Sequence, residues 1–535
     1  MSRRVLETDI CIIGSGISAA MVAEKIADTR RAQILVIEAG DDVPPPSQFP
    51  GLRQRYLDYG ESPWPKDHLD DAEVTGMQSR SMCVGGLAMH WGGVTPRFAP
   101  EDFKTRSLCG VGTDWPLSYE DLEPHYLEAE QRMGVAGGQG PADLDPRAQP
   151  FPMPEIPLTW NLERLKEWAT RAGIPMWSQP SAKLTVARPG RGACCRNDTC
   201  FPICPVGAKY SPDMTWRALR GSGRVTLLPR TMIRRLRVAS DDGRIVMAEG
   251  VRRDRPGETL QVRAKTFVVA GGYTWSSHLL LLSTDPRHPN GVANRSGLVG
   301  KYLCGHRNVQ AFVELPMPMV PGMNEQHSLV TKYFMRKPRV EKYVRHDLRV
   351  WESTVGRGAR PTNDAGELLL GDALMNDWRQ RTRATSTARV RSYYDVIPAR
   401  NSELTLDASR QNAFGDPLPK LQWNDDPLSR DLRGYTEDRI RSVFAEMARA
   451  GNGAIMRTNS DSFQDHPAGG CRMGDDPATS VTDSYGRTHD HENLFVVGAP
   501  TAVSGSCANG TLTFCALSLR AAEQIGATFP AHTGP

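Results

Sequence analysis

The sequence predicts an α/β protein in which a lobe built on a parallel sheet is joined to a second, α+β lobe built on an antiparallel sheet. Three patterns indicate this fold class. Buried strands flank a helix at the N-terminus, a buried strand and a closing helix return at the C-terminus, and residues 308–460 change to alternating and polar runs. With 535 residues, the chain also exceeds the size at which one hydrophobic core stops growing.

The N-terminal lobe opens with a βαβ unit. Residues 9–14 form a short apolar run that ends on glycine, which is typical of a buried parallel strand. Residues 17–28 have helical composition, and 33–38 form a second buried strand. A further helix is expected after Ser118, because Asp121 three positions later completes a capping pair.

The other strands of this lobe are scattered along the chain. One of them precedes a closing helix that is expected to begin near residue 511. The alternating run 402–406 is assigned instead to the antiparallel second lobe. The scattered strands are expected at 225–228, 244–251, 266–270 and 493–498.

The parallel-sheet lobe is therefore predicted to be discontinuous. Its parts are residues 1–155, 225–308 and 461–535. A proline- and glycine-rich crossing near the end of the first part marks the connection between the lobes. Residues 156–224 are an insertion that carries a cysteine-rich loop, and residues 309–460 form the second lobe.

Composition excludes several classes of function. The formal net charge is only +4 and the basic residues are scattered, so nucleic acid is not an expected partner. The chain has no uninterrupted apolar run of about 18 residues, so no membrane span is expected. Arg3 and Arg4 lack the apolar segment of a twin-arginine signal. The protein is expected in the cytoplasm, or in the periplasm after co-export with a partner subunit that carries a signal.

The N-terminal unit contains a dinucleotide-binding fingerprint. Gly14, Gly16 and Ala19 match G-x-G-x-x-G/A between a strand and a helix. The helix N-terminus supplies amides and partial positive charge to a pyrophosphate. Glu38 ends the next strand about 20 residues later, where a carboxylate binds ribose hydroxyls. This pattern predicts a Rossmann-like site but does not distinguish FAD from NAD.

A second glycine-rich segment follows at Gly85 and Gly86, with His90 and Trp91 soon after. Glycine pairs allow backbone to approach a flat ring closely, although a simple flexible loop has the same composition.

The C-terminal part carries two residues suited to chemistry. His466 lies in Asp-His-Pro-Ala-Gly-Gly, and Asn509 lies in Ala-Asn-Gly-Thr-Leu-Thr. Between them, Gly498 ends the last buried strand and is expected beside the cofactor. In isolation, a histidine before proline is more often a capping or core residue than a catalytic one.

Together these segments resemble the glucose–methanol–choline (GMC) oxidoreductase family, over essentially the whole chain. The resemblance rests on the fingerprint, the Gly-Gly…His90-Trp91 segment, Asp114-Trp115-Pro116 and the His466/Asn509 pair. It implies an FAD-binding domain of the GMC type with FAD as cofactor. It also implies that His466 lies beside the flavin N5 and takes the hydroxyl proton, with Asn509 at the second catalytic position.

The chemistry fits these residue types. Hydride leaves a carbinol carbon only as its hydroxyl becomes alkoxide-like, and a neutral imidazole is the natural base near pH 7. An amide at the second position holds the substrate oxygen without competing for the proton. His466 and Asn509 are therefore expected to be the catalytic pair.

His90 has two interpretations. His90-Trp91 matches the position at which pyranose oxidases attach their flavin covalently, and related sugar dehydrogenases keep the same dipeptide. Covalent attachment and simple packing against the isoalloxazine ring both remain open.

The cysteines form an unusual cluster. Cys194, Cys195, Cys200 and Cys204 fall in one short loop, and the last is followed by proline as in ferredoxin-type runs. Structural zinc sites usually place a second cysteine pair far away. An iron–sulfur loop is favoured, with disulfides, free structural thiols or another metal as alternatives.

This loop is similar to that of bacterial FAD-dependent glucose dehydrogenases, which hold a 3Fe-4S centre. The resemblance implies Cys194, Cys200 and Cys204 as ligands and Cys195 as a spare. It also implies a cytochrome as electron acceptor and a small chaperone or signal-bearing subunit as partner.

The favoured function is oxidation of a secondary or anomeric hydroxyl of a sugar or glycoside, with electrons passed through the cluster to an external acceptor. An oxidase of the pyranose or glycoside type, which reduces dioxygen to peroxide, is the alternative. A non-catalytic flavoprotein is disfavoured, because an electron carrier has no use for an imidazole and an amide over the flavin.

Overall fold

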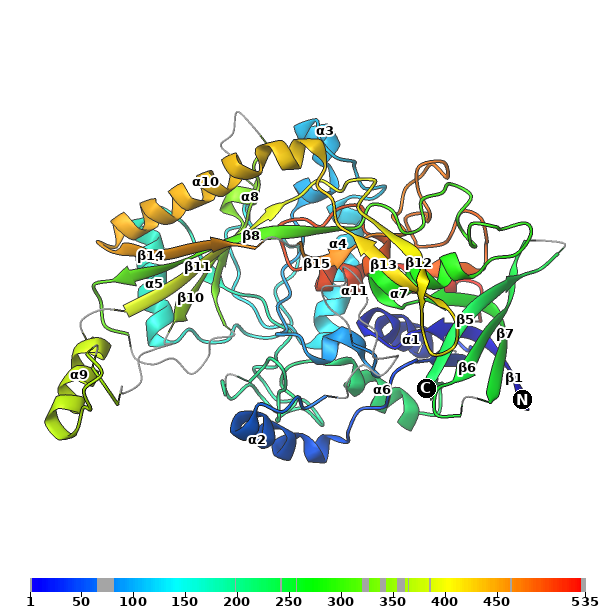
Figure 1. The fold of residues 1–535 in the computed structure, drawn as a ribbon, viewed down its shortest axis with the longest axis horizontal. Helices are drawn as coiled ribbons and strands as arrows, with labels where there is room; N and C mark the ends of the chain where they lie inside the picture. Colours follow the sequence, from blue (N-terminus) through cyan, green and yellow to red (C-terminus); the bar gives the residue numbers. More distant parts are fainter. Residues whose placement is uncertain are drawn as a thin grey trace.

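The computed structural model describes residues 2–64, 81–197, 199–240, 243–255, 257–319, 327–336, 343–353, 361–363, 365–383, 386–461 and 464–530. Two large sheets lie toward opposite ends of the molecule, and much of the helical structure packs around them (Figure 1). This arrangement confirms the predicted α/β fold class with a second, antiparallel lobe.

The first sheet has seven strands in the order β4-β2-β1-β7-β6-β5, with β16 added beside β7. The pairs that involve β1, β2, β4 and β16 are parallel, whereas β5, β6 and β7 pair antiparallel. The apolar runs predicted as buried strands form its centre. The strands are β1 (Ser2–Ile13), β2 (Ile34–Ile37), β4 (Val225–Leu228), β5 (Thr231–Val238), β6 (Ile245–Arg252), β7 (Glu258–Val269) and β16 (Leu494–Val496).

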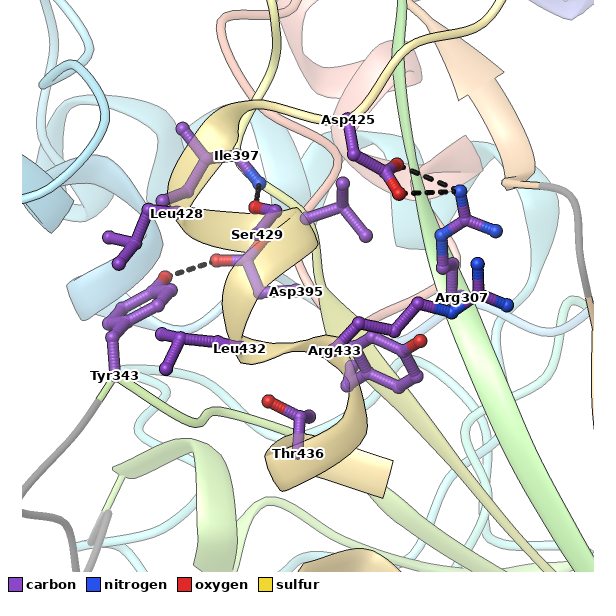
Figure 2. Close-up of a pocket in the computed structure, with 12 residues that line it drawn as sticks. Arg307, Tyr343, Asp395, Ile397, Asp425, Leu428, Ser429, Leu432, Arg433 and Thr436 are labelled. Carbon is purple, nitrogen blue, oxygen red and sulfur yellow. Dashed lines mark hydrogen bonds and ion pairs between the residues drawn. The ribbon is translucent and has the colours of Figure 1, made fainter. Parts of the chain in front are cut away.

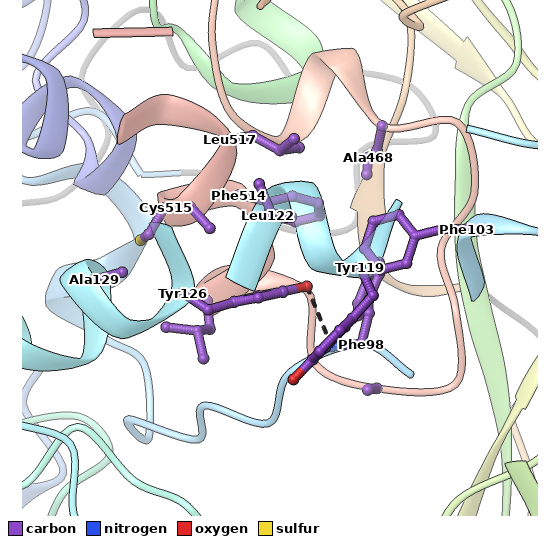
Figure 3. Close-up of a cluster of buried hydrophobic side chains, with 14 of the residues drawn as sticks. Phe98, Phe103, Tyr119, Leu122, Tyr126, Ala129, Ala468, Phe514, Cys515 and Leu517 are labelled. Atoms are coloured by element: carbon purple, nitrogen blue, oxygen red, sulfur yellow. Dashed lines mark hydrogen bonds between the residues drawn. The ribbon is translucent and has the colours of Figure 1, made fainter. Parts of the chain in front are cut away.

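Helices from remote parts of the sequence pack together on this sheet. The capping pair Ser118 and Asp121 is present at the start of α4, as the sequence predicts. The hydroxyl of Tyr126 lies 2.8 Å from that of Thr513 in the C-terminal helix and accepts a 3.4 Å hydrogen bond from the Phe98 amide. Figure 3 shows the second of these bonds within a core of aromatic side chains. The helices are α1 (Ile17–Thr29), α4 (Tyr119–Met133), α6 (Pro212–Gly221), α7 (Gly272–Leu282) and α11 (Thr511–Gly526).

The second sheet also has seven strands, in the order β14-β8-β11-β10-β9-β3, with β15 beside β8. Every pair in it is antiparallel. One face is apolar and is covered by the helices α5 (Trp160–Arg171) and α10 (Pro427–Ala450). The strands are β3 (Trp177–Ser178), β8 (Cys304–Leu315), β9 (Leu329–Thr331), β10 (Leu348–Ser353), β11 (Ser386–Asp395), β14 (Ala454–Ser460) and β15 (Asp465–Ala468).

The alternating pattern of residues 402–406 predicted a strand of this second sheet, and this prediction is wrong. The run begins β12 (Glu403–Gln411), which forms a separate hairpin with β13 (Pro417–Gln422). Leu404 and Leu421 of the hairpin are buried with Tyr273 of α7, so apolar contact draws the hairpin to the first lobe. The short helices elsewhere are α2 (Phe49–Tyr59), α3 (Thr105–Cys109), α8 (Tyr333–Arg336) and α9 (Gly371–Arg383).

In the part of the chain that the structure describes, no helix combines the length and apolar character needed to cross a bilayer. The boundaries of the five predicted segments stay a prediction. Strands β14 and β15 show that residues between 454 and 468, on both sides of the predicted boundary at 460, contribute to the second sheet.

Candidate active site

A cavity of about 800 Å³ runs from the N-terminal fingerprint to the predicted catalytic pair. Gly14, Gly16 and Glu38 line one part of it, and His466 and Asn509 line another. The structure thus brings residues from both ends of the chain to one space. The other predicted site residues on its wall are Gly86, His90 and Trp91.

The fingerprint turn is built around Gly14. Its φ is +100°, and a Cβ atom there would lie 2.5 Å from the carbonyl oxygen of Ala270, so only glycine fits. At Gly16 a Cβ would meet no atom within 4 Å, which leaves open space at the helix N-terminus for a phosphate group. Both positions fit a bound dinucleotide.

Glu38 is buried, and two backbone amides and one hydroxyl group hold its carboxylate in place. Its carboxylate accepts hydrogen bonds from the Ser15 amide at 2.9 Å, the Ser15 hydroxyl at 2.6 Å and the Gly40 amide at 2.7 Å. Burial raises the pKa of this carboxyl above its usual value. These contacts fix the carboxylate at the cavity wall, where ribose hydroxyls are expected.

The second glycine segment packs directly on the first. The Gly85 amide donates to the Ser15 hydroxyl at 3.2 Å, so Ser15 links Glu38 to this segment. A Cβ on Gly86 would lie 3.4 Å from the Cα of Gly16. The two segments therefore form one continuous cradle.

Ala19 and Gly498 do not line the cavity. Ala19 is fully buried inside α1, and a Cβ on Gly498 would lie 2.1 Å from the hydroxyl of Ser18. Both residues allow α1 to pack closely against its neighbours.

A buried lysine holds the segment around His90. The Lys209 ammonium donates to the carbonyl oxygens of Trp91 at 2.7 Å and Cys200 at 2.6 Å, so it joins this segment to the cysteine loop. Burial and the Lys209 charge together lower the pKa of His90 to about 4, so its imidazole is neutral at pH 7. His90 faces the cavity as an uncharged ring.

The two residues of the predicted catalytic pair are in direct contact. His466 lies in β15 with a φ of +51°, an uncommon conformation for a residue other than glycine. Asn509 lies immediately before α11, and its Nδ2 is 2.5 Å from Nε2 of His466. The Oδ1 atom of Asn509 is buried, and no hydrogen-bond partner for it is found among the described residues. A polar atom without a partner at the cavity wall fits a site that binds a hydroxyl.

A third residue, His306 of β8, completes this arrangement. Its Nε2 lies 2.8 Å from Nδ1 of His466, and its Nδ1 lies 3.0 Å from the carbonyl oxygen of Ser506. His306 was not predicted from the sequence. Its surroundings, Cys-Gly-His-Arg, match no motif, and the pairing of β8 with β15 that brings it to His466 is a long-range contact.

Charged groups surround the pair. Burial lowers the pKa of His466, the Asp465 carboxylate opposes this shift, and two arginines, Arg349 and Arg391, add to it. Burial lowers the pKa of His306 to about 3. Both imidazoles are therefore neutral near pH 7, as a general base requires.

Replacing Asp465 by asparagine is expected to shift the pH dependence of catalysis. Its carboxylate is 3.7 Å from Nδ1 of His466 and raises that residue's pKa, so its removal lowers the pKa further. The predicted role of His466 as the base makes the neutral imidazole the active form, so the acidic limb of the kcat/KM profile should move to lower pH by about one unit. Exposed Asp407→Asn is the control, and a shift to higher pH would contradict the assignment.

A small cavity of about 20 Å³ lies behind β8, between the strand and α10 (Figure 2). Arg307 forms a two-bond ion pair with Asp425 there, at 2.8 and 3.0 Å, and Tyr343 donates to Asp395. The ion pair of Arg307 anchors β8 on the side away from His306, and the contact of Tyr343 holds the end of β11.

The cysteine loop does not form a metal site in this conformation. Cys195 is exposed, Cys200 is buried and all the cysteines are free thiols. Within the described ranges, no three His, Cys, Asp or Glu side chains are placed to hold a metal ion. Asp198, inside the loop, lies outside those ranges. The assignment of Cys194, Cys200 and Cys204 as ligands stays a prediction.

The fold and cavity define a nucleotide-dependent oxidoreductase. Residues 398–518 match the GMC oxidoreductase family. The chain is 30% identical to the fructose dehydrogenase large subunit of Gluconobacter japonicus, over 98% of this chain and 99% of that protein. It is also 30% identical to paromamine 6'-oxidase of Streptomyces fradiae, over 97% and 91%. The chain therefore belongs to the GMC oxidoreductase family, which confirms the resemblance drawn from the sequence.

A solved structure shares the fold. Pyridoxine 4-oxidase from Mesorbium loti superposes with a TM-score of 0.61 at 18% identity, over 96% of this chain and 98% of that one. The family makes FAD the expected cofactor, and the cradle formed by Gly14, Gly16 and Gly86 fits it.

Proposed function

We propose that the protein is an FAD-dependent dehydrogenase that oxidises a secondary or anomeric hydroxyl of a sugar or glycoside. One observation carries the proposal: the cavity that begins at the dinucleotide fingerprint ends at the contact between His466 and Asn509. An imidazole and an amide at the end of a cofactor cavity suit the removal of a hydroxyl proton.

The side chains divide the chemistry between them. Bound FAD supplies the hydride acceptor. The substrate hydroxyl replaces the direct contact between His466 and Asn509: it donates to Nε2 of the imidazole and accepts from Nδ2 of the amide. His466 takes the hydroxyl proton, while Asn509 holds the oxygen as negative charge develops on it.

A polar face of the second sheet supports a polyhydroxylated substrate. Strand register places Tyr393 opposite Asn308 and Arg391 opposite Gln310, on the same face as His306. Arg391 also stacks on Trp351, with 4.8 Å between the guanidinium carbon and the ring centroid. Of these groups, Tyr393 lies beside the proposed catalytic pair, with 5.5 Å between its ring centroid and that of His466. Donors, acceptors and aromatic rings are the groups that bind sugars.

The electron acceptor belongs to the same proposal. The cysteine spacing favours an iron–sulfur loop, and the resemblance to glucose dehydrogenase subunits implies a 3Fe-4S cluster on Cys194, Cys200 and Cys204 with a cytochrome as acceptor. The relative named a large subunit supports a multisubunit enzyme. The described conformation does not gather the sulfurs, so iron binding would require the loop to close around the metal.

An oxidase is the second candidate, supported by the 30% identity to paromamine 6'-oxidase. In this case reduced flavin passes its electrons to dioxygen and releases peroxide.

Anaerobic reduction of the flavin tests the proposal. We expect one of D-glucose, D-fructose or methyl glucoside to bleach the visible flavin bands of the purified protein. A one-electron dye should then restore the bands faster than air does, and the same sample should contain iron and acid-labile sulfide. Rapid reoxidation by air with peroxide release and no iron would establish the oxidase instead. Bleaching by none of these sugars, but by a simple alcohol, would overturn the sugar assignment.

A further inference from the structure

We infer that His306 is a positioning residue that fixes which nitrogen of His466 is free to accept a proton. The inference rests on the proposed role of His466 as the base. It concerns a residue that does not line the cavity and touches the base from behind.

The hydrogen-bond chain has a single consistent direction. The carbonyl oxygen of Ser506 can only accept, so Nδ1 of His306 must carry the hydrogen in their 3.0 Å contact. In a neutral imidazole the other nitrogen is then an acceptor. Nε2 of His306 therefore accepts from Nδ1 of His466, at 2.8 Å. This leaves Nε2 of His466 without a hydrogen.

The bare nitrogen is the one that faces the substrate position. Nε2 of His466 lies 2.5 Å from Nδ2 of Asn509, which is a donor. In the opposite tautomer two N–H groups would face each other at this contact, and two lone pairs would face each other at His306. The chain from Ser506 to Asn509 therefore selects the tautomer that can act as a base.

Asp465 does not replace His306 in this role. Its nearer contact to Nδ1 of His466 is 3.7 Å, beyond hydrogen-bond length. One of its oxygens accepts from the His466 backbone amide at 2.9 Å, and the other accepts from the Tyr393 hydroxyl at 3.0 Å. The carboxylate acts on the imidazole through its charge, as Arg349 and Arg391 do with opposite sign.

His306 is rigidly held. Its side chain is fully buried, and the ring of Tyr393 packs on it with 4.1 Å between centroids. The next residue, Arg307, is anchored by Asp425 on the other side of the strand (Figure 2). A buried and anchored ring keeps its orientation, so the tautomer it imposes is preorganised before substrate arrives.

Two substitutions separate this role from a packing role. His306→Gln can place an amide oxygen where Nε2 lies and so keeps an acceptor for His466. His306→Asn has a shorter side chain that can reach Ser506 but not His466. We expect flavin reduction by the bleaching sugar to slow about 100-fold in H306N. We expect H306Q to stay within several-fold of the parent, with flavin content equal in all three proteins.

The tautomer itself is read by nitrogen NMR of the holoenzyme with ¹⁵N-labelled histidine, in the absence of any sugar. In the parent and in H306Q, the His466 spectrum should show a protonated Nδ1 and a bare Nε2. In H306N it should show a mixture of both tautomers. A protonated Nε2 in the neutral parent, or equal rates for H306N and H306Q, would overturn the inference. Failure of every sugar to bleach the parent would instead contradict the proposed function, while the NMR result would still decide the role of His306.

Discussion

Replacing His466 by alanine is expected to slow substrate-driven flavin reduction by roughly 10²–10⁴-fold, the usual contribution of a general base. The imidazole is half-buried and contacts Asn509 on one side and His306 on the other, so its removal takes away the only neutral base found at this end of the cavity in the described residues. The measurement is the single-turnover rate of bleaching in a stopped-flow instrument without oxygen.

His288→Ala is the matched control for this prediction. His288 pairs with Asp285 and is not among the residues that line the cavity. Its loss should leave the bleaching rate unchanged. If H466A retained its flavin and reduced it as fast as the parent does, the assignment of His466 as the base would be wrong, and a non-catalytic flavoprotein would be favoured.

Replacing Gly14 by alanine is expected to abolish flavin binding and to lower the melting temperature of the protein. The new Cβ would lie 2.5 Å from the Ala270 carbonyl oxygen, at a backbone φ of +100°. Strain of this kind costs about 1–3 kcal/mol before any clash is relieved. The turn must move, and it carries the amides that face the pyrophosphate. Flavin absorbance relative to protein absorbance measures the loss.

Substitutions at two further glycines distinguish a loss of cofactor binding from a loss of folding stability. Gly16→Ala meets no protein atom within 4 Å, so it should weaken flavin binding while the cofactor-free protein keeps its melting temperature. Gly51→Ala, on the exposed surface of α2, should leave the flavin content unchanged and should not lower the melting temperature, because alanine favours a helix more than glycine does. Normal flavin content in G14A would show that this turn does not form the cofactor site.

Local sequence patterns were sufficient to predict the strands around the fingerprint and the helix cap of the first lobe. The strands around Gly14 and Glu38 are short apolar runs buried on both faces, and this pattern depends little on distant residues. The cap at Ser118 is equally local. These elements were predicted correctly for that reason.

The features that could not be predicted from the sequence depend on contacts between residues that are far apart in the chain. The hairpin that begins at Glu403 alternates like a sheet strand, but its apolar residues contact α7 rather than the second sheet. His306 becomes part of the site only because β8 pairs with β15, where Asp465 lies opposite it. No spacing rule links these two positions, which are remote in the sequence.

The order of the strands also has a consequence for how the protein is made. Strand β1 is synthesised first but has β7 on one side, and β7 receives its last neighbour, β16, only near the end of translation. Domains generally fold as units and from the N-terminus during synthesis, at roughly 5–20 residues per second. Here the C-terminal end of β7 keeps an unpaired edge until β16 has been made, and the cofactor cavity stays incomplete until Asn509 follows. Slow translation of the middle segments would prolong that exposed state, so the assembly of this lobe is the step at which a chaperone would have most effect.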